Sequence, residues 1–249
     1  MRTTFLCDFD GTIAPADIGK ALVERFSSGD PKRHRALLAG WLSGTTGHRE
    51  LTVAECGMMR VTAAEAVAFT RGFGLDPHFA GFARAARARG DRVLVVSEGF
   101  DFYIQDQLDR AGLGDLPWAA NRVRFEGDRM IPSFPHGTGP AEGGSGCGRC
   151  GNCKAQHVRH ARAAGDAVVL VGDGLSDRCA AEIADTVLAR DGLLTWCRAR
   201  GIEALPFEDF ATVAALAHAG RLGSGHGSAP RPPSPPTLSV ASGAGSGAP

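Results

Sequence analysis

The sequence predicts an α/β protein whose core is a Rossmann-like, doubly wound parallel sheet, with a small helical cap inserted after the first strand. Three short apolar runs, at 4–7, 93–96 and 168–171, read as strands buried on both faces, because they lack polar alternation. Each run is followed by a polar turn and then by a helical pattern, which is typical of a doubly wound sheet. Ligands bind beyond the carboxyl ends of such strands, so we expect the three polar turns to meet at one site.

The segment between the first two runs contains helix signals and no clear strand. Asp30-Pro31 and Asp76-Pro77 each place an N-cap residue before a proline at the first helical position. Thr62 and Glu65 form a capping box, and the helix opened at Asp76 is expected to end near Gly90. We therefore assign 15–87 to a helical cap, and 1–14 with 88–222 to the core.

Two further segments have patterns of their own. Residues 122–131 alternate around Gly127-Asp128 and predict a β-hairpin. From residue 223 to 249 the chain is mostly Gly, Ser, Pro and Ala, which cannot bury enough apolar surface to fold. We expect this stretch to be a disordered tail.

Composition limits the partners of the protein. Of 249 residues 43% are hydrophobic, and Lys+Arg and Asp+Glu both number 27, so the net charge of zero gives no argument for nucleic acid. No run approaches the roughly 18 apolar residues of a membrane span, and no signal peptide is evident. Seven irregularly spaced cysteines favour reduced thiols in a cytoplasmic protein. A small phosphorylated metabolite is the expected partner, and both a monomer and a homodimer remain open.

The first polar turn carries paired carboxylates, in Asp8-Phe9-Asp10-Gly11-Thr12. Two aspartates two residues apart at a strand end can point into one site, where one attacks phosphorus and the other transfers protons. Their oxygens are also hard ligands of the kind that Mg²⁺ prefers. The alternative is a strand-ending turn with solvated acids.

This turn resembles the first motif of the haloacid dehalogenase superfamily, and the other motifs follow in order up to residue 177. Ser97 matches the second motif, Lys154 the third, and Asp173 with Asp177 the acidic fourth. The resemblance implies a phosphatase in which Asp8 is the nucleophile and Asp10 the acid–base group. Ser97, with the backbone N–H groups of Glu98 and Gly99, can donate to a phosphoryl oxygen, and Lys154 can neutralise its charge. The resemblance implies Mg²⁺ held by Asp8, the carbonyl of Asp10 and Asp173, with Asp177 holding Lys154 or a metal-bound water.

The segments around these motifs resemble one group within that superfamily, the methionine-salvage phosphatases that act on 2-hydroxy-3-keto-5-methylthiopentenyl-1-phosphate. The matching segments are 97–103, the cysteine-rich approach to Lys154, 189–194 and 205–210. The plan is similar to that of phosphoserine phosphatases, which implies that Asp17 contacts the leaving group; a helix N-cap before Ile18 is the alternative. Glu98 replaces the glycine that relatives often carry, which leaves other substrates open, such as phosphocholine-like or sugar phosphates. No cap arginine matches the carboxylate-binding one of phosphoserine phosphatases, so phosphoserine is disfavoured.

Three cysteines precede the lysine, at Cys147, Cys150 and Cys153, with the close spacing of thiolate metal sites. A structural Zn²⁺ with His136 or His157 as fourth ligand is one interpretation, and reduced loop thiols are the other. A non-catalytic zinc-binding module on the same fold is accordingly the rival to an enzyme. His34, His48 and His78 are interpreted as surface or packing residues.

Overall fold

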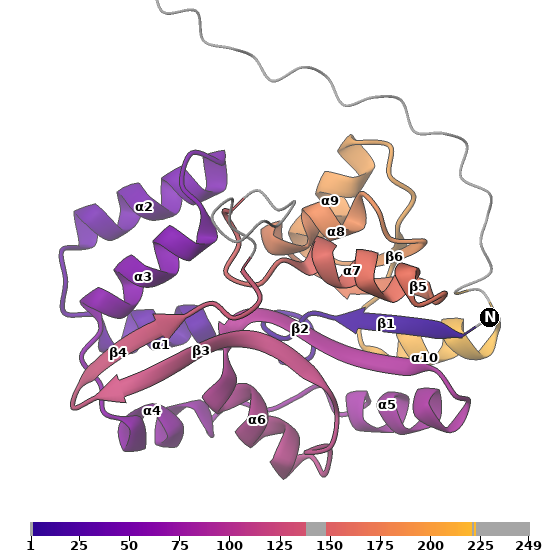
Figure 1. Cartoon of the computed structure of the whole chain (residues 1–249), viewed down its shortest axis with the longest axis horizontal. Helices are drawn as coiled ribbons and strands as arrows, with labels where there is room; N and C mark the ends of the chain where they lie inside the picture. Colours follow the sequence, from indigo (N-terminus) through magenta and orange to yellow (C-terminus); the bar gives the residue numbers. More distant parts are fainter. Residues whose placement is uncertain (1, 138–147, 221, 223–249) are drawn as a thin grey trace, which may run out of the picture.

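A single seven-stranded sheet runs through the protein in the order β4–β3–β2–β1–β5–β6–β7 (Figure 1). The structure is a computed structural model that describes residues 2–137, 148–220 and 222. Neighbouring strands are parallel except β3 and β4, which are antiparallel. The chain builds outward from β1 first on one side and then on the other, which confirms the doubly wound parallel sheet. The strands are β1 (Thr3–Cys7), β2 (Arg92–Phe100), β3 (Trp118–Glu126), β4 (Arg129–Ser133), β5 (Ala167–Gly172), β6 (Thr186–Ala189) and β7 (Leu205–Pro206).

Both faces of the central strands are buried, which explains their unbroken apolar sequences. In β1, Phe5 and Cys7 join one hydrophobic cluster, and Leu6 between them joins the other. Strand β5 alternates in the same way, with Val169 on the first side and Val168 on the second. Since successive side chains of a strand point to opposite faces, an apolar residue is needed at every position.

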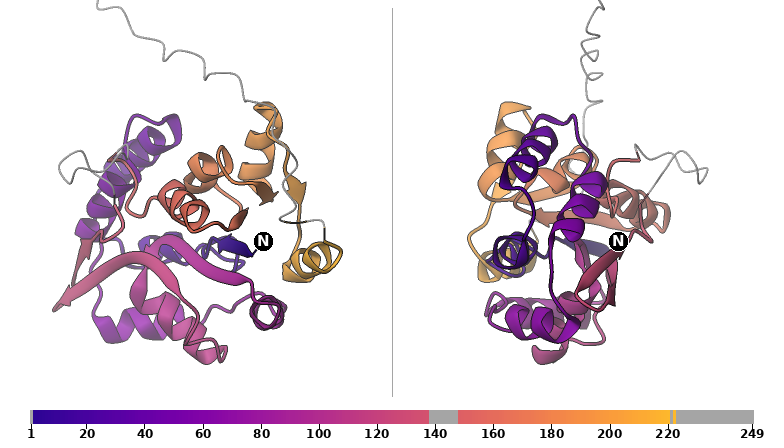
Figure 2. Two further views of the ribbon diagram at one scale, coloured as in Figure 1. Left: turned by 45° about the vertical axis from the view of Figure 1, so that its right-hand side comes forward. Right: turned by 90° about the vertical axis from the view of Figure 1, so that its left-hand side faces the viewer.

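Helices cover both faces of the sheet. Helices α5, α6 and α10 contribute to the cluster that contains Phe5, and α7, α8 and α9 to the cluster that contains Leu6 (Figures 1 and 2). The helices are α1 (Ile18–Phe26), α2 (Pro31–Ser43), α3 (His48–Met58), α4 (Ala63–Thr70), α5 (Phe79–Ala88), α6 (Asp101–Arg110), α7 (Lys154–Ala163), α8 (Arg178–Ala181), α9 (Asp191–Ala199) and α10 (Phe210–His218), with a short 3₁₀ turn η2 (Leu175–Asp177).

Two of the three predicted helix starts are confirmed. Helix α2 begins at Pro31, and the Asp30 carboxylate accepts the N–H of Lys32 at 2.8 Å. Helix α4 begins after Thr62 with the complete capping box. In each case a polar side chain satisfies backbone donors that the first helical turn leaves open.

The third predicted start is wrong. Helix α5 begins at Phe79 rather than at Pro77. The Asp76 carboxylate accepts the N–H of His78 at 2.8 Å and, through its other oxygen, the N–H of Phe210 at 3.0 Å. Asp76 therefore joins the approach to α5 to the start of α10, a partner 134 residues away that the local sequence does not reveal.

The predicted hairpin is confirmed as β3 and β4. Glu126 lies opposite Arg129, so Gly127 and Asp128 form a two-residue connection, with Gly127 at φ +62°. A positive φ is adopted most readily by glycine, which accounts for this residue in the turn. The carbonyl of Asp128 accepts the N–H of Val61 at 2.8 Å and so fastens the hairpin to the segment between α3 and α4.

The two outer strands of the sheet are short and each contains a proline. Strand β4 carries Pro132 and pairs only with β3, while the two-residue β7 ends in Pro206 and pairs only with β6. Proline lacks an N–H, so it is tolerated at a sheet edge where no further strand must pair.

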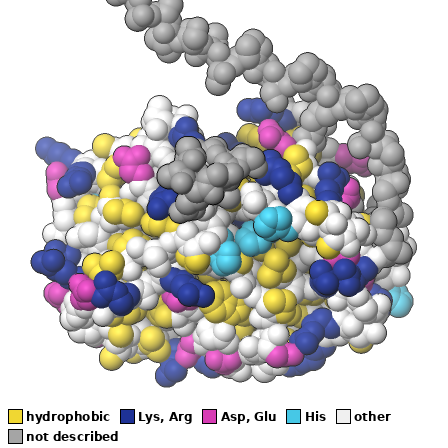
Figure 3. Space-filling model, viewed as in Figure 1, with side chains coloured by type: hydrophobic (Ala, Val, Ile, Leu, Met, Phe, Trp, Pro, Cys, Tyr) yellow, Lys and Arg dark blue, Asp and Glu magenta, His cyan; other side chains and the backbone are white. Residues whose placement is uncertain are grey.

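The predicted tail, 223–249, lies outside the described residues. No helix in the described part of the chain is both long and apolar enough to cross a bilayer. On the face drawn in Figure 3, basic and acidic side chains are interspersed rather than gathered by sign.

Candidate active site

The carboxyl ends of β1, β2 and β5 open into one cavity of about 320 Å³. Most of the predicted site residues line it, namely Asp8, Asp10, Asp17, Ser97, Glu98, Gly99 and Asp173. The opposite wall comes from α1, α2 and α3, with Leu38, Trp41, His48 and Glu55 among its residues. Residues up to 168 positions apart, Asp8 and Ser176, therefore meet where the parallel strands end, as the topology requires.

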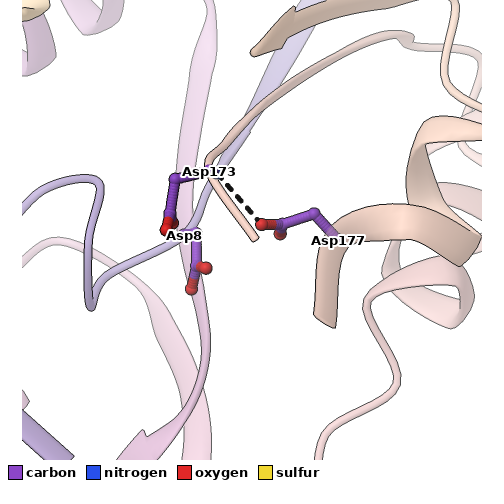
Figure 4. A group of neighbouring side chains, drawn as sticks. All are labelled: Asp8, Asp173 and Asp177. Carbon is purple, nitrogen blue, oxygen red and sulfur yellow. Dashed lines mark hydrogen bonds between the residues drawn. The ribbon is translucent and has the colours of Figure 1, made fainter. Parts of the chain in front are cut away.

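Three aspartates lie together at the floor of the cavity. Carboxylate oxygens of Asp8, Asp173 and Asp177 are all within 4.8 Å of one another, and Figure 4 shows Asp177 reaching back toward Asp173 from the turn that follows β5. Burial and the neighbouring Asp177 raise the pKa of Asp8 well above its usual value, although Lys154 lowers it. Burial and Asp177 also raise the pKa of Asp173, to about 6. The positive charge near these clustered carboxylates is too small to keep the pKa values of Asp8 and Asp173 in their usual range.

Lys154 is the cation that the chain itself supplies to this floor. It begins α7 and is buried, and its Nζ lies 2.7 Å from both Asp8 Oδ2 and Asp177 Oδ1 and donates to Ser176 Oγ at 2.9 Å. Burial opposes the charged form, but Asp177 and Asp8 raise the pKa of Lys154 above its ordinary range. The prediction that Asp177 holds Lys154 agrees with this geometry.

The three carboxylates and one ammonium suit a divalent cation. Three carboxylates share one lysine within a few ångströms, and burial, together with their mutual repulsion, raises the pKa values of Asp8 and Asp173. All the ligand atoms are hard oxygens, which Mg²⁺ prefers. The carboxylate of Asp10 is not in this group, so a bond from Asp10 to a metal would use its carbonyl oxygen, as predicted.

Asp10 has different partners from Asp8. Its Oδ1 accepts the N–H of Ile18 at 2.9 Å, and its Oδ2 accepts the hydroxyl of Tyr103 at 2.7 Å. Burial and the nearby Asp17 raise the pKa of Asp10 to about 7, although the Tyr103 hydrogen bond lowers it. A carboxyl group with such a pKa can both give and accept a proton near neutral pH. Tyr103 was not among the predicted site residues, and its one local signal is its position in the helix after Ser97.

The Ser97 turn differs from the expected arrangement. Ser97 and Gly99 lie within β2, which continues to Phe100, and the N–H of Gly99 donates to Ser97 Oγ at 2.9 Å. That N–H is therefore bonded to the Ser97 side chain, and its donation to a phosphoryl oxygen stays a prediction. A Cβ at position 99 would overlap the Tyr103 hydroxyl and Asp10 Oδ2, so only glycine fits there.

Glu98 lines the cavity, but both oxygens of its carboxylate have partners. Its Oε2 lies 2.9 Å from Nδ1 of His48, and its Oε1 accepts the N–H of Gly151 at 2.9 Å and of Asn152 at 3.4 Å. Burial alone would raise the pKa of Glu98, but His48 and Lys154 hold it below its usual value. Burial likewise opposes protonation of His48, yet Glu98 raises its pKa. His48, interpreted as a surface or packing residue, thus has a buried carboxylate partner that the sequence did not indicate.

The helical wall adds a second histidine–carboxylate pair. His34 Nε2 lies 2.9 Å from Glu55 Oε1, and both side chains line the cavity. Asp17 caps α1 by accepting the N–H of Lys20 at 2.8 Å and also lines the cavity, so both interpretations of this residue remain compatible with its position. His34 and Glu55 lie 21 positions apart on different helices, and no local pattern links them.

The proposed zinc site falls only partly on described residues, because Cys147 lies outside them. Cys153 is buried and precedes α7, and the rings of His136 and His157 lie 5.6 Å apart between centroids. Within the described ranges, the only group of three side chains placed to share a metal ion is the aspartate trio. The cysteine zinc site thus receives no support from these residues.

The family model of haloacid dehalogenase-like hydrolases matches residues 5–182. A 2-hydroxy-3-keto-5-methylthiopentenyl-1-phosphate phosphatase of Exiguobacterium sibiricum is 31% identical over 217 residues, covering 84% of this chain and 94% of the relative. One of Brevibacillus brevis is 29% identical over 215 residues, covering 85% and 91%.

Solved structures agree with the fold. A phospho-aspartyl intermediate analogue of phosphoserine phosphatase superposes with a TM-score of 0.64 at 16% identity, covering 86% of this chain and 98% of that one. A substrate-bound phosphoserine phosphatase complex gives 0.63 at 15% identity, with coverage of 87% and 98%. The four motifs assemble around one cavity, and the family model matches most of the length of the chain. The chain therefore belongs to the haloacid dehalogenase-like hydrolases.

Proposed function

We propose that the protein is a Mg²⁺-dependent phosphatase that hydrolyses a small phosphomonoester through an aspartyl-phosphate on Asp8. The observation that carries this proposal is that two aspartates only two residues apart have different partners and different environments. Asp8 contacts Lys154 at 2.7 Å beside the acidic floor, and Asp10 is held by Tyr103 and the N–H of Ile18, with a pKa of about 7. This difference supports Asp8 as the nucleophile and Asp10 as the proton carrier.

The reaction follows from these placements. Asp8 attacks phosphorus, the bond from phosphorus to the leaving oxygen breaks, and protonated Asp10 gives its proton to that oxygen. Asp10, now a carboxylate, accepts a proton from water as the water oxygen attacks the aspartyl-phosphate, which releases phosphate and restores Asp8. The ammonium of Lys154 offsets negative charge on Asp8 and on the phosphoryl group. Mg²⁺ held by Asp8, Asp173 and the carbonyl of Asp10 would neutralise further charge on the phosphoryl oxygens.

We propose 2-hydroxy-3-keto-5-methylthiopentenyl-1-phosphate as the first substrate to test. The names of relatives near 30% identity support it. The cavity wall supports an uncharged, partly apolar leaving group, because Leu38, Trp41, Leu51 and Met59 line it. Among the described lining residues none is an arginine, both histidines are paired with glutamates, and Lys20 is an exposed side chain 3.8 Å from Glu24. This lining disfavours a leaving group with its own carboxylate, such as phosphoserine.

The insert between β1 and β2 supplies the wall opposite the motifs, which supports its proposed role as a cap. Helices α1, α2 and α3 contribute this wall, whereas α5, inside the proposed 15–87 range, packs on Phe5 and Phe210 through Phe82. Closure of this wall over a bound substrate would exclude bulk water during attack.

Hydrolysis of p-nitrophenyl phosphate in Mg²⁺ tests the chemistry. We expect turnover that disappears in EDTA, returns with Mg²⁺ and is inhibited by Ca²⁺, which coordinates more loosely. Asp8→Asn should abolish turnover, since the amide has the same shape but is a poor nucleophile. Asp115→Asn, in an exposed pair with Arg87, is the matched control. Near-normal turnover of Asp8→Asn, or full activity in EDTA, would contradict the proposal. A panel of phosphorylated metabolites, assayed with the wild-type protein, ranks the candidate substrates.

A further inference from the structure

The loop before Lys154 is irregular, although it positions a buried lysine of the site. Residues 148–153 have no regular helix or strand, yet Lys154 directly after them must stay 2.7 Å from Asp8. Catalytic side chains need placement to within ~0.5 Å, which a glycine-rich loop cannot provide by itself. Some group outside the loop must therefore fix it.

Two buried side chains hold this loop. Glu98 Oε1 accepts the N–H of Gly151 at 2.9 Å and of Asn152 at 3.4 Å. The Asn152 side chain donates in turn to the carbonyls of Ser97 at 2.9 Å and Ala119 at 2.7 Å. Both loop residues and Glu98 are buried, so water cannot replace these bonds cheaply. The loop is thus tied to the ends of β2 and β3 two residues before the lysine.

The same carboxylate also reaches the helical wall. Glu98 Oε2 pairs with His48 Nδ1 at 2.9 Å, and His48 is the first residue of α3. A second link runs alongside, since the N–H of Arg49 donates to the carbonyl of Arg149 at 3.0 Å. One side chain therefore connects the helical wall of the cavity, the end of β2 and the loop before Lys154.

We propose that Glu98 is a positioning residue of the reaction, which fixes Lys154 through the backbone of Gly151 and Asn152 and fastens that loop to His48 of α3. The reaction part of this inference rests on the proposed phosphatase function. Glu98 does not touch the phosphoryl group; it acts by holding the loop that presents the lysine ammonium to Asp8.

The first test measures the loop directly, without activity. Amide hydrogen exchange at Gly151 and Asn152 is followed by NMR in ¹⁵N-labelled full-length protein. Glu98→Ala should speed exchange at both amides at least tenfold, whereas Glu98→Gln, which keeps an oxygen acceptor, should change it much less. Glu55→Ala is the matched control, because Glu55 forms a histidine pair of the same length on the same wall but no bond to the loop. Unchanged exchange in Glu98→Ala overturns the proposal.

The second test measures the link to Lys154. With p-nitrophenyl phosphate, Glu98→Ala should lower kcat by about 10- to 100-fold, the range found when a partner that orients a metal ligand is removed. In a Lys154→Ala background, studied by single turnover with excess enzyme, the same change should have little further effect, because its target is gone. An equal loss in both backgrounds, or faster exchange with unchanged kcat, overturns the proposal.

Two provisions separate a failure of the Glu98 proposal from a misfolded variant and from a failure of the phosphatase proposal. If Glu98→Ala does not fold, Glu98→Asp replaces it, since it keeps the charge but is one methylene too short to reach both partners. If the wild type hydrolyses no phosphate ester, the phosphatase proposal fails and takes the reaction role of Glu98 with it. The exchange measurement still decides in that case whether Glu98 holds the loop.

Discussion

Asp8 and Asp10 share a sequence motif but occupy unlike environments. Asp8 is buried beside Lys154 and two further carboxylates, whereas Asp10 accepts one backbone N–H and the Tyr103 hydroxyl. The pKa of Asp10, about 7, results from burial and Asp17, which raise it, and from Tyr103, which lowers it. Two neighbours of one carboxyl group thus act in opposite directions, and each can be removed separately.

Tyr103→Phe should shift the alkaline limb of the kcat/KM–pH profile to higher pH, because loss of the hydroxyl donor raises the pKa of Asp10. Protonated Asp10 is the acid of the first step, so activity falls as pH rises through its pKa. Asp17→Asn should shift the same limb to lower pH, because it removes a negative charge, and asparagine still caps α1. Shifts of the same sign in both variants would show that Asp10 is not the titrating acid.

At the scale of elements, α5 and α10 depend on an aromatic cluster. Phe82 lies 5.1 Å from Phe5 of β1 and 5.3 Å from Phe210 of α10, measured between ring centroids. The Asp76 carboxylate adds a bond to the N–H of Phe210. This cluster joins three elements that are far apart in the chain.

Phe82→Ala should lower the free energy of unfolding by about 3–5 kcal/mol, the range for deleting a buried phenyl ring. The ring is 2% exposed and its neighbours are fixed by the sheet, so little collapse can fill the space. Leu42→Ala on α2 is the control, since Leu42 is 61% exposed and should change stability by less than about 0.5 kcal/mol. Chemical denaturation of both variants measures the difference, and a loss below about 1 kcal/mol for Phe82→Ala would contradict this account.

For the molecule as a whole, the acidic floor makes stability depend on pH and on metal. Asp173 has a pKa of about 6 in the folded protein, above the 3.8 of an ordinary aspartate. An acid with a raised folded pKa binds more protons in the folded than in the unfolded state between those values. Without metal, its contribution to stability is therefore lost as pH rises from about 4 to 6.

Mg²⁺ should raise the melting temperature more at pH 7.5 than at pH 5, because it binds the ionised carboxylates and relieves their repulsion. At a concentration 100 times the dissociation constant, a ligand specific for the folded state contributes about 2.7 kcal/mol. Asp173→Asn should stabilise the metal-free protein at pH 7.5 and reduce the gain from Mg²⁺. Thermal scans with and without metal at both pH values measure this. An equal gain at pH 5 and pH 7.5 would indicate that the metal does not bind the trio.

The local sequence predicted the sheet well, for a physical reason. Buried parallel strands need apolar residues at every position, and Asp8 follows directly after such a strand. Lys154, at the start of a helix, was assigned through the family resemblance rather than from a local pattern. Tyr103 and the His48–Glu98 pair were missed because their partners lie 93 and 50 positions away. The role of Asp76 was misjudged for the same reason. Pairings of this kind depend on how the elements pack, which no short stretch of sequence records.

The prolines in β4 and β7 bear on how copies of this chain can associate. An open strand edge presents a row of backbone donors and acceptors on which a strand of another molecule can pair. Pro132 and Pro206 remove a donor from each outer strand, and β7 is only two residues long. The sheet is therefore a poor template for continuation across molecules, and a homodimer should form through helices or loops instead.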